Sequence, residues 1–457
     1  MRELTDSDFV SVPLSEPAFF EAVVDQQGGR KMRHGPINWH NVGDWINLVE
    51  PHEFPEMHRA PTQHQISLRV FHIPLGLRSA QINAKRESWE ILSSQFELHD
   101  STAEAFLDVN GAFGFYSYRS TDGTRSIERV KIIVKVANKM TIGYQALSLV
   151  FDFSKLTIKA LIHGALPAQW DSFINLLCDS LHLCHHPLLL PTVLFVSHRL
   201  EIDHYRKRID DSILQMERET GFGVAGILTT DQDRTFAQQS FSLESALVQL
   251  QSQQTELATL ANVSRFSDRF SDFLFNSISR LNQTLRTSDH HHILELEDEI
   301  FHMLELPRSQ AKSALSQIQS LKERVQSQTS LIFSLISSEE NRTSRFVAEE
   351  SAKVAIASKR DSMAMKTVAV LTMIFLPGTF VAAFLSMPFF EWNADTGSYP
   401  SSTPFQWIYW AITLPLTIAL MVGWQVWWKM EDKLWNTELD EAKKEARFRL
   451  SGRTYSE

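Results

Sequence analysis

Hydroxyl and small side chains recur in the C-terminal part of this chain at alternating steps of three and four residues. An average spacing of about 3.5 residues places them on one face of a helix and predicts helices supercoiled left-handedly about one another. Such side chains let helices approach closely, and their oxygen atoms can line a narrow wet passage for ions. Periodicity alone leaves two alternatives open: tight packing without conduction, or a pore. The positions of this heptad face are Ser344, Ala348, Ser351, Ala355, Ser358, Ser362, Met365, Val368, Thr372, Leu376, Thr379, Ala383 and Ser386.

Two long apolar segments are expected to cross a membrane. Residues 365–390 carry one charged side chain, Lys366, close to their N-terminal end, and the heptad face continues through them. Residues 405–428 carry aromatic rings at both ends, where amphipathic rings prefer to lie in a bilayer. Each segment has about the 20 residues that a membrane-spanning helix needs. The sequence therefore predicts two transmembrane helices, residues 364–387 and 405–428.

Charged residues set the expected orientation of this hairpin. Lysine and arginine precede the first segment and lysine follows the second, whereas the loop of residues 388–404 carries Glu391 and Asp395 and no basic residue. By the positive-inside rule, both termini are expected in the cytoplasm or matrix. The opening residues do not form a cleavable signal sequence, so the first apolar segment is expected to direct the chain to the lipid bilayer.

The first apolar segment resembles the corresponding helix of the CorA family of magnesium transporters. In that family a long cytoplasmic stalk helix enters the membrane, passes a Pro-x-Thr-Phe step and ends in Gly-Met-Asn. Pro377, Thr379 and Phe380 match the step, whereas Ser-Met-Pro stands in place of Gly-Met-Asn. The resemblance is specific over the C-terminal part of the chain and architectural over the remainder. It therefore indicates a divergent CorA-like protein.

The resemblance implies a funnel-shaped homopentamer in which five copies of the first membrane helix surround one pore. In the family, the asparagine of Gly-Met-Asn supplies a ring of amide oxygens at the pore mouth. Pro388 has no such group, so hydroxyl and backbone carbonyl oxygens are the expected replacements, and they discriminate less well between cations. The expected ion pathway is Met365, Val368, Thr372, Leu376, Thr379, Ala383 and Ser386, with a pore mouth of Ser386, Met387 and Pro388 and an entrance loop holding Glu391 and Asp395.

Gating is expected to differ from that of the family. Family members bind Mg²⁺ between acidic side chains of neighbouring cytoplasmic subunits, which holds their gate shut. The equivalent heptad-face position here is Ser351, and Glu349, Glu350 and Asp361 lie at other helical angles. Apolar rings on the cytoplasmic half of the pathway would instead close it by excluding water.

The part of the chain that precedes the apolar segments combines strand and helix signals. Residues 112–119 and 130–136 alternate and are separated by a turn, which predicts a hairpin, and residues 146–153 and 157–162 predict another. Helices are expected at residues 170–185, 192–217, 242–285 and 307–387, with a further helical segment at 290–304.

The expected fold class is an α+β cytoplasmic domain followed by a long α-helical coiled-coil stalk and a two-helix transmembrane hairpin. The expected division is an N-terminal segment 1–36, an α/β cytoplasmic domain 37–220, a helical stalk 221–363, the first membrane helix 364–387, an acidic loop 388–404, the second membrane helix 405–428 and a charged tail 429–457.

Other candidate motifs favour structural roles. Gly221, Gly223 and Gly226 have dinucleotide-loop spacing but follow a helix and precede no helix, so no such site is expected. Cysteine and histidine cluster on an apolar helix without a second ligand pair, so no metal site is assigned. A net charge of −10 disfavours a nucleic-acid partner. The cluster is Cys178, His182, Cys184, His185 and His186, and a second histidine run is His290, His291 and His292.

The resemblance to CorA transporters implies a transporter of divalent cations, not an enzyme, whose partners are copies of itself, the bilayer and the cation. No cofactor is expected beyond Mg²⁺ or a related divalent ion, transported or regulatory. The alternative is a non-conducting, membrane-tethered scaffold or sensor whose cytoplasmic domain binds partners. Ion flux through purified protein in liposomes would distinguish the two.

Removing the loop charges tests the entrance loop. Two carboxylates in each of five subunits would raise the local cation concentration, and salt screens this field with a Debye length of about 8 Å at physiological ionic strength. Replacing Glu391 by Gln and Asp395 by Asn should lower cation uptake several-fold at low ionic strength and much less at high ionic strength. An equal loss at all salt concentrations would point to a folding or direct-ligand role, and no loss to a merely solvated loop.

Overall fold

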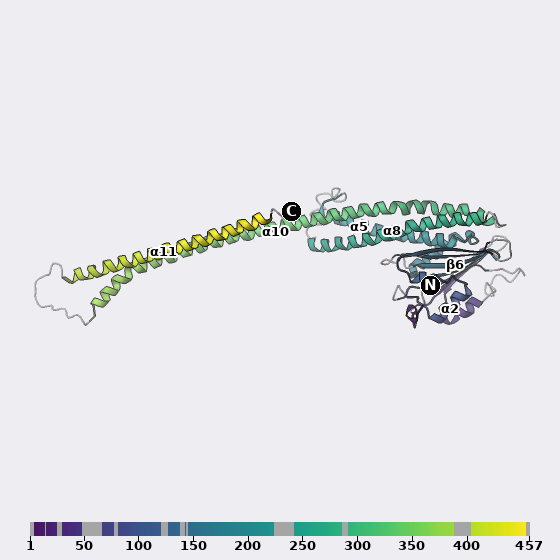
Figure 1. Cartoon of the computed structure of the whole chain (residues 1–457), viewed down its shortest axis with the longest axis horizontal. Coiled ribbons are helices and arrows are strands. Elements are labelled where there is room, and N and C mark those ends of the chain that lie inside the picture. The colour runs from purple at the N-terminus through teal and green to yellow at the C-terminus, as the bar shows by residue number, and fades with distance from the viewer. Residues whose placement is uncertain are drawn as a thin grey trace. The chain divides into compact units, whose positions relative to one another are not determined.

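The computed structural model describes residues 4–13, 15–24, 30–47, 66–76, 81–119, 127–137, 142, 145–223, 242–285, 291–387 and 404–453. The chain divides into two compact units, Met1–Ile336 and Ser337–Glu457. The first unit contains a mixed α+β sheet domain, and the second contains long apolar helices (Figure 1). One helix, α10 (Glu297–Leu385), has residues in both units.

The first unit is built on a seven-stranded sheet in the order β2-β1-β3-β7-β6-β5-β4. Every neighbouring pair is antiparallel except β3 and β7, which are parallel. The two hairpins predicted from the sequence are confirmed as β4 with β5 and β6 with β7. The strands are β1 (Ala18–Val24), β2 (Arg30–Pro36), β3 (Ile66–Ile73), β4 (Ala112–Arg119), β5 (Ile127–Lys135), β6 (Ala146–Asp152) and β7 (Thr157–His163).

The first 36 residues, set apart in the sequence as an N-terminal segment, contribute β1 and β2 to this same sheet. Strand β1 is apolar and lies between β2 and β3, whereas β2 is an edge strand with no buried residue. The basic side chains of β2 suit an edge, where charge discourages pairing with another chain. Glu21 of β1 is a buried carboxylate that forms ion pairs with both neighbouring strands, with Arg33 of β2 at 2.5 Å and with Arg69 of β3 at 2.8 Å.

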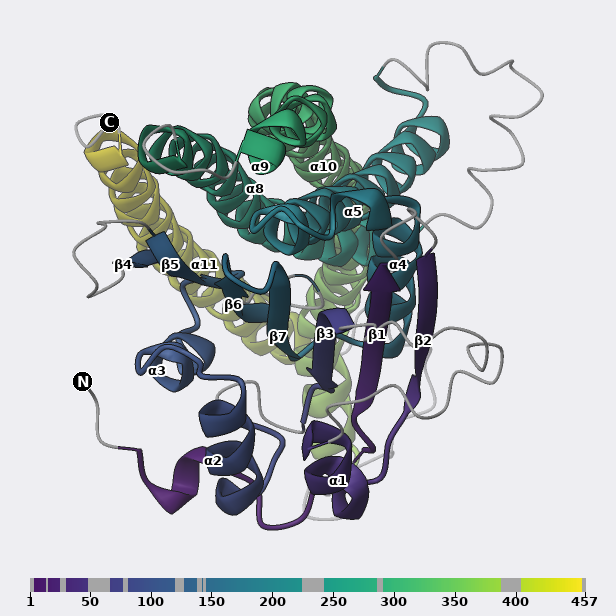
Figure 2. The ribbon, with the colours of Figure 1, turned by 90° about the vertical axis from the view of Figure 1, so that its right-hand side faces the viewer.

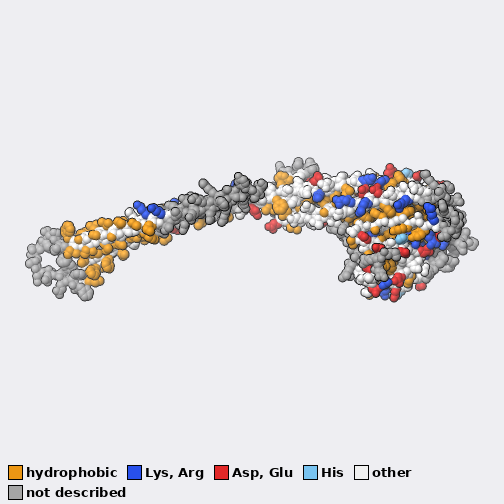
Figure 3. Space-filling view, in the orientation of Figure 1, with side chains coloured by type: hydrophobic (Ala, Val, Ile, Leu, Met, Phe, Trp, Pro, Cys, Tyr) orange, Lys and Arg blue, Asp and Glu red, His pale blue; other side chains and the backbone are white. Residues whose placement is uncertain are grey.

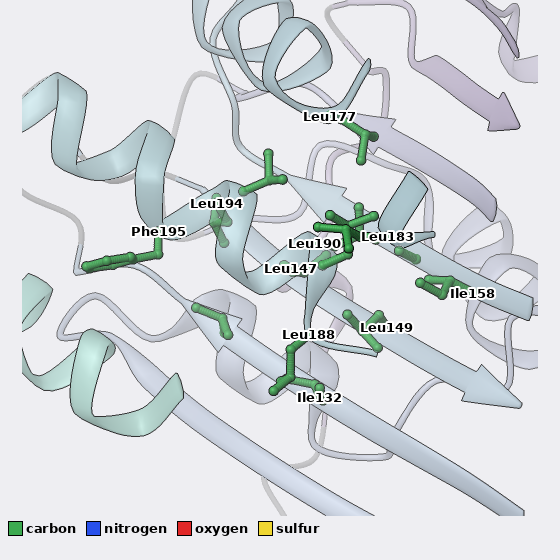
Figure 4. Packing of buried hydrophobic residues seen from close by; sticks show 14 of the residues in the cluster. Ile132, Leu147, Leu149, Ile158, Leu177, Leu183, Leu188, Leu190, Leu194 and Phe195 are labelled. Atoms are coloured by element: carbon green, nitrogen blue, oxygen red, sulfur yellow. The ribbon is translucent and has the colours of Figure 1, made fainter. Parts of the chain in front are cut away.

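Helices cover both faces of the sheet (Figure 2). Alternate side chains of β6 point to opposite faces of the sheet. Leu147 and Leu149 belong to one buried cluster, and Ala146 and Val150 belong to another. The first cluster includes Leu190 of the helices on one face (Figure 4). The second cluster includes side chains of α1 (Val42–Asn47), α2 (Arg86–Gln95) and α3 (Thr102–Leu107), and the first includes side chains of α4 (Pro167–Asp179), α5 (Leu189–Thr220) and α8 (Leu243–Leu285).

Long helices extend beyond the sheet. Helices α5, α8 and the first part of α10 form a third buried cluster through Ile209, Leu257 and Val325, which is the packing expected of amphipathic helices in a bundle. Helix α5 ends at Thr220 and is capped by Gly221, whose φ of 74° is the left-handed conformation that glycine adopts after helix ends. Shorter elements are the 3₁₀ turns Asp6–Asp8, Trp39–Asn41 and Leu181–Leu183 and helix α9 (His291–Glu295).

Helix α10 begins earlier than the sequence indicates. The expected start was Pro307, but the helix begins at Glu297 and passes through this proline without a break. A proline inside a helix removes one backbone hydrogen bond, at a cost of about 3 kcal/mol. Ile300 and Leu304 are fully buried in the core beside the sheet, and their burial offsets that cost. Helix α11 (Pro404–Arg453) likewise contains Pro415.

A carboxyl group joins three elements of the first unit. Glu201 of α5 accepts hydrogen bonds from the side-chain amides of Gln145, which precedes β6, and Gln169 of α4, each at 3.0 Å. Removal from water raises the pKa of Glu201 to about 8, against the opposing effect of the two amide hydrogen bonds. The carboxyl therefore binds a proton more tightly in the folded protein than in the unfolded chain.

The raised pKa predicts a loss of stability as the pH rises. Between the ordinary value of 4.5 and about 8, the folded protein holds a proton on Glu201 that the unfolded chain has released. The melting temperature of the detergent-solubilised protein should therefore fall by several degrees from pH 5 to pH 8, and by less in Glu201→Gln. Asp211→Asn, an exposed carboxylate on the same helix, is the control. The same pH dependence in Glu201→Gln and wild type would contradict this role.

Candidate functional site

Two helices contain segments that are long and apolar enough to cross a membrane. They are the C-terminal part of α10 and residues Trp407–Met430 of α11, and each apolar window exposes nearly all of its residues in the single chain. Hydrophobic side chains cover the visible face of both segments (Figure 3). Large exposed apolar surfaces of this kind indicate contact with lipid or with other protein chains.

The two apolar helices contact each other as an antiparallel hairpin. The hydroxyl of Tyr409 donates to the carbonyl oxygen of Gly378 at 3.5 Å, and the ammonium of Lys366 lies 5.4 Å from the ring centre of Trp428. The order of the contacts is reversed along the two helices, as it must be in a hairpin. Gly378 permits the approach, because a Cβ atom there would lie 3.1 Å from the Tyr409 hydroxyl oxygen.

The expected ion pathway lies on a face of α10 that α11 leaves uncovered. Val381 is only 5% exposed and Pro377 is also buried, whereas Leu376 is 67% exposed. All seven expected pathway residues are exposed in the single chain: Met365, Val368, Thr372, Leu376, Thr379, Ala383 and Ser386. The structure therefore places these residues together along one helix, on a side free to contact other copies of the chain.

Three hydroxyl groups on this face have the same hydrogen-bonding arrangement. Each donates to the carbonyl four residues earlier: Thr372 to that of Val368 at 3.1 Å, Thr379 to that of Phe375 at 3.0 Å and Ser386 to that of Ala382 at 2.8 Å. A hydroxyl that has donated its hydrogen to the helix backbone retains lone pairs and acts as an acceptor. The water molecules around a cation present O–H donors, so these oxygens suit a hydrated cation.

The helix end adds further oxygen atoms. Helix α10 ends at Leu385, where the amide of Met387 still donates to the carbonyl of Phe384 at 3.2 Å. The last carbonyl groups of a helix lack intrahelical partners, and the helix dipole gives this end a partial negative charge. Ser386 and Met387 thus lie where a cation is favoured. Of the other pore-mouth and entrance-loop residues, Pro388, Glu391 and Asp395 lie outside the described residues.

The acidic residues near Ser351 have a local partner. Lys353 contacts Glu350 at 2.8 Å and Glu349 at 3.6 Å, one turn away on the same exposed helix surface. Ion pairs of this kind between exposed side chains contribute at most about 1 kcal/mol. The arrangement provides a charge partner within the helix for both carboxylates.

The cysteine and histidine candidates between Cys178 and His186 lie in the sheet domain, whereas His290 lies outside the described residues. Cys184 is buried, which raises its pKa to about 11, and Cys178 contacts the sulfur of Met32 at 3.3 Å. His182 lies 2.6 Å from a carboxylate oxygen of Glu299 on α10. Within the described residues, no three His, Cys, Asp or Glu side chains are placed to hold a metal ion.

Comparison with known proteins gives short or distant matches. No protein-family model matches the chain. The notoamide biosynthesis cluster protein M' of Aspergillus versicolor is 43% identical over 61 residues, which make up 13% of this chain and 13% of that protein. The structure of the full-length CmaX protein aligns over 89% of this chain and 98% of CmaX, with 13% identity and a TM-score of 0.37. A TM-score this low carries no argument, and none of these matches assigns the chain to a family.

Proposed function

We propose that the protein assembles as a homopentamer in a membrane and transports divalent cations through a pore lined by the heptad face of α10. The observation that carries this proposal is the exposed row of acceptor hydroxyls at Thr372, Thr379 and Ser386 within an apolar helix segment. Small and hydroxyl side chains on one helix face let neighbouring helices approach closely, so assembly that encloses this face is favoured. The resemblance of the Pro377-x-Thr379-Phe380 step to CorA transporters supports five copies around the axis.

A pore of this composition suits hydrated ions. Mg²⁺ releases its water shell reluctantly, so a site that hydrogen-bonds the shell is more favourable than one that strips it. Rings of hydroxyl oxygens at Thr372 and Thr379, together with the helix-end carbonyls near Ser386, provide acceptors for the shell. Because these rings replace the amide ring of Gly-Met-Asn, the pore admits a wider range of divalent cations than a CorA magnesium transporter.

The apolar pathway residues form the gate. Met365, Val368 and Leu376 are each more than 60% exposed in the single chain, so in the pentamer they would project toward the axis as apolar rings. A narrow apolar ring excludes water and with it the hydrated ion. Rotation or spreading of the five α10 helices would wet the rings and open the path.

A second candidate function is a non-conducting membrane scaffold or sensor. The replacement of Gly-Met-Asn by Ser-Met-Pro and the absence of an acidic residue at Ser351 favour it, since both positions serve ion conduction or gating in the CorA family. In this alternative the pentamer forms and the sheet domain binds partners. Assembly and conduction must therefore be measured separately.

Native mass spectrometry followed by flux measurement tests both parts of the proposal. The protein in detergent should have the mass of a pentamer. Reconstituted into liposomes, it should admit Mg²⁺, Co²⁺ or Ni²⁺ down a concentration gradient, as reported by an entrapped fluorescent indicator. Only monomers or dimers would contradict the assembly, and a pentamer without flux of any of these ions would support the scaffold instead.

Removing hydroxyl oxygens from the pathway should reduce flux without affecting assembly. Ser386→Ala and Thr379→Ala should each lower divalent-cation flux several-fold, because each removes one ring of acceptors. Thr367→Ala is the matched control, since Thr367 also donates to a helix carbonyl but lies off the heptad face. Loss of flux in Thr367→Ala to the same extent, or unchanged flux in both pathway variants, would remove these hydroxyls from the mechanism.

A further inference from the structure

A polar layer separates two apolar clusters in the bundle formed by α5, α8 and α10 of the first unit. On one side, each helix contributes to the buried cluster beside the sheet, through Phe195, Phe270 and Ala311. On the other side, the same helices form the third cluster, which includes Ile202, Leu260 and Ile318. Between the two clusters lies a cavity of about 250 Å³. Its lining is Arg199, Ile202, Asp203 and Arg206 of α5, Ser264 and Ser267 of α8, and Ser309, Gln310, Ala311, Ser313, Ala314 and Gln317 of α10.

The cavity carries an excess of positive charge. Arg199 and Arg206 line it, and Asp203 is the one acidic side chain among its lining residues. Asp203 already has two cationic partners, Arg206 at 2.9 Å and Lys207 at 3.3 Å. Burial alone would raise its pKa, but the hydrogen bonds and charges of Arg206 and Lys207 together lower it. Its charge is therefore neutralised locally. Burial lowers the pKa of Arg199 and Asp203 offsets this only in part, so an anion beside this guanidinium would be stabilising.

Three buried hydrogen-bonding groups at the cavity have no hydrogen-bond partner among the residues that the structure describes. They are the Nε of Arg199 and the hydroxyls of Ser264 and Ser267, whose residues on α8 are 0% and 1% exposed. Elsewhere on the same helix, Ser271 and Ser277 donate to the carbonyls of Asp268 and Phe273 at 2.7 and 2.8 Å. A buried polar group without a partner costs roughly 1–3 kcal/mol. The cavity therefore retains donors that a bound ligand can satisfy.

We propose that this cavity binds a tetrahedral oxyanion of the size of phosphate. A guanidinium and several hydroxyls converging from three helices provide charge-assisted and neutral donors to an anion with oxygen acceptors on every side. Water alone would satisfy the hydroxyls but not the net positive charge. A cation is disfavoured because the one carboxylate is already paired. The bound anion would join α5, α8 and α10 where their apolar packing is interrupted.

Thermal unfolding of the full-length protein in detergent, with sodium phosphate as the ligand, tests this site. Phosphate should raise the melting temperature in a saturable manner, and sodium chloride at equal ionic strength should not. Arg199→Gln should weaken phosphate binding at least tenfold, and the double variant Ser264→Ala, Ser267→Ala should weaken it several-fold. Arg218→Gln is the matched control, because it removes the same charge from an exposed position of α5 outside the cavity.

Two further measurements keep the test decisive. If Arg199→Gln does not fold, as judged by circular dichroism, Arg199→Lys retains the charge but loses the planar pair of donors, and it should still weaken binding. Line broadening of the phosphorus NMR signal of phosphate measures binding without unfolding the protein. Equal phosphate affinity in wild type and the folded Arg199 variant, or an equal effect of chloride, would overturn the proposal.

A phosphomonoester provides the same oxyanion from a different source. Glycerol 3-phosphate should bind through the same Arg199-dependent site, and its affinity relative to inorganic phosphate decides which source the cavity prefers. If inorganic phosphate binds at least tenfold more tightly, the free anion is the ligand of the cavity. Tighter binding of the ester assigns a phosphorylated small molecule. In either case, Arg199→Gln should weaken binding of the ligand that the wild-type protein binds more tightly.

Discussion

Hydroxyl groups on the apolar C-terminal part of α10 have few neighbouring groups to hydrogen-bond with, and this constraint determines how they are arranged. The hydroxyls of Thr372 and Thr379 in this segment, and that of Ser386 just after it, donate to carbonyl groups of the helix backbone. This arrangement makes each residue tolerable in an apolar helix, and it also fixes the hydroxyl as an acceptor. The hydrogen bond from hydroxyl to backbone therefore has two effects. It allows the side chain to lie in apolar surroundings, and it leaves an acceptor that attracts hydrogen-bond donors. A row of donors at these positions would suit an anion instead.

The sheet domain illustrates what periodicity can and cannot predict. The hairpins of β4–β5 and β6–β7 follow from alternating apolar residues with a turn between them, because both strands of each pair are adjacent in sequence. Strands β1 and β2 are missed as part of the domain, because β1 joins the sheet through β3, and that pairing depends on long-range contacts. The start of α10 is misplaced at Pro307, because the burial of Ile300 and Leu304 outweighs the local preference.

The two polar sites of the first unit could not be found from the sequence for a related reason. Glu201 meets Gln145 and Gln169 from three separate elements, and neither amide is close to it in sequence. The proposed oxyanion cavity likewise depends on the register of three helices, which brings Arg199, Ser264 and Ser313 to the lining of one cavity. Serine at three- and four-residue spacing in α8 is a usable signal, since it interrupts an apolar face. By contrast, the heptad face is visible in the sequence because a single helix, α10, carries all of it except Ser386.

The parallel pairing of β3 with β7 has a consequence for the order in which the protein can form. Leu68 of β3 has Ile158 of β7 as its partner, so the second edge of β3 stays open until the chain has been synthesised through both later hairpins. Non-local pairing of this kind slows folding, and an open apolar strand edge is prone to pair with other nascent chains. During this interval the apolar helices have not yet left the ribosome. The sheet therefore passes through an unfinished state, with an apolar strand edge open, before either apolar helix has been synthesised.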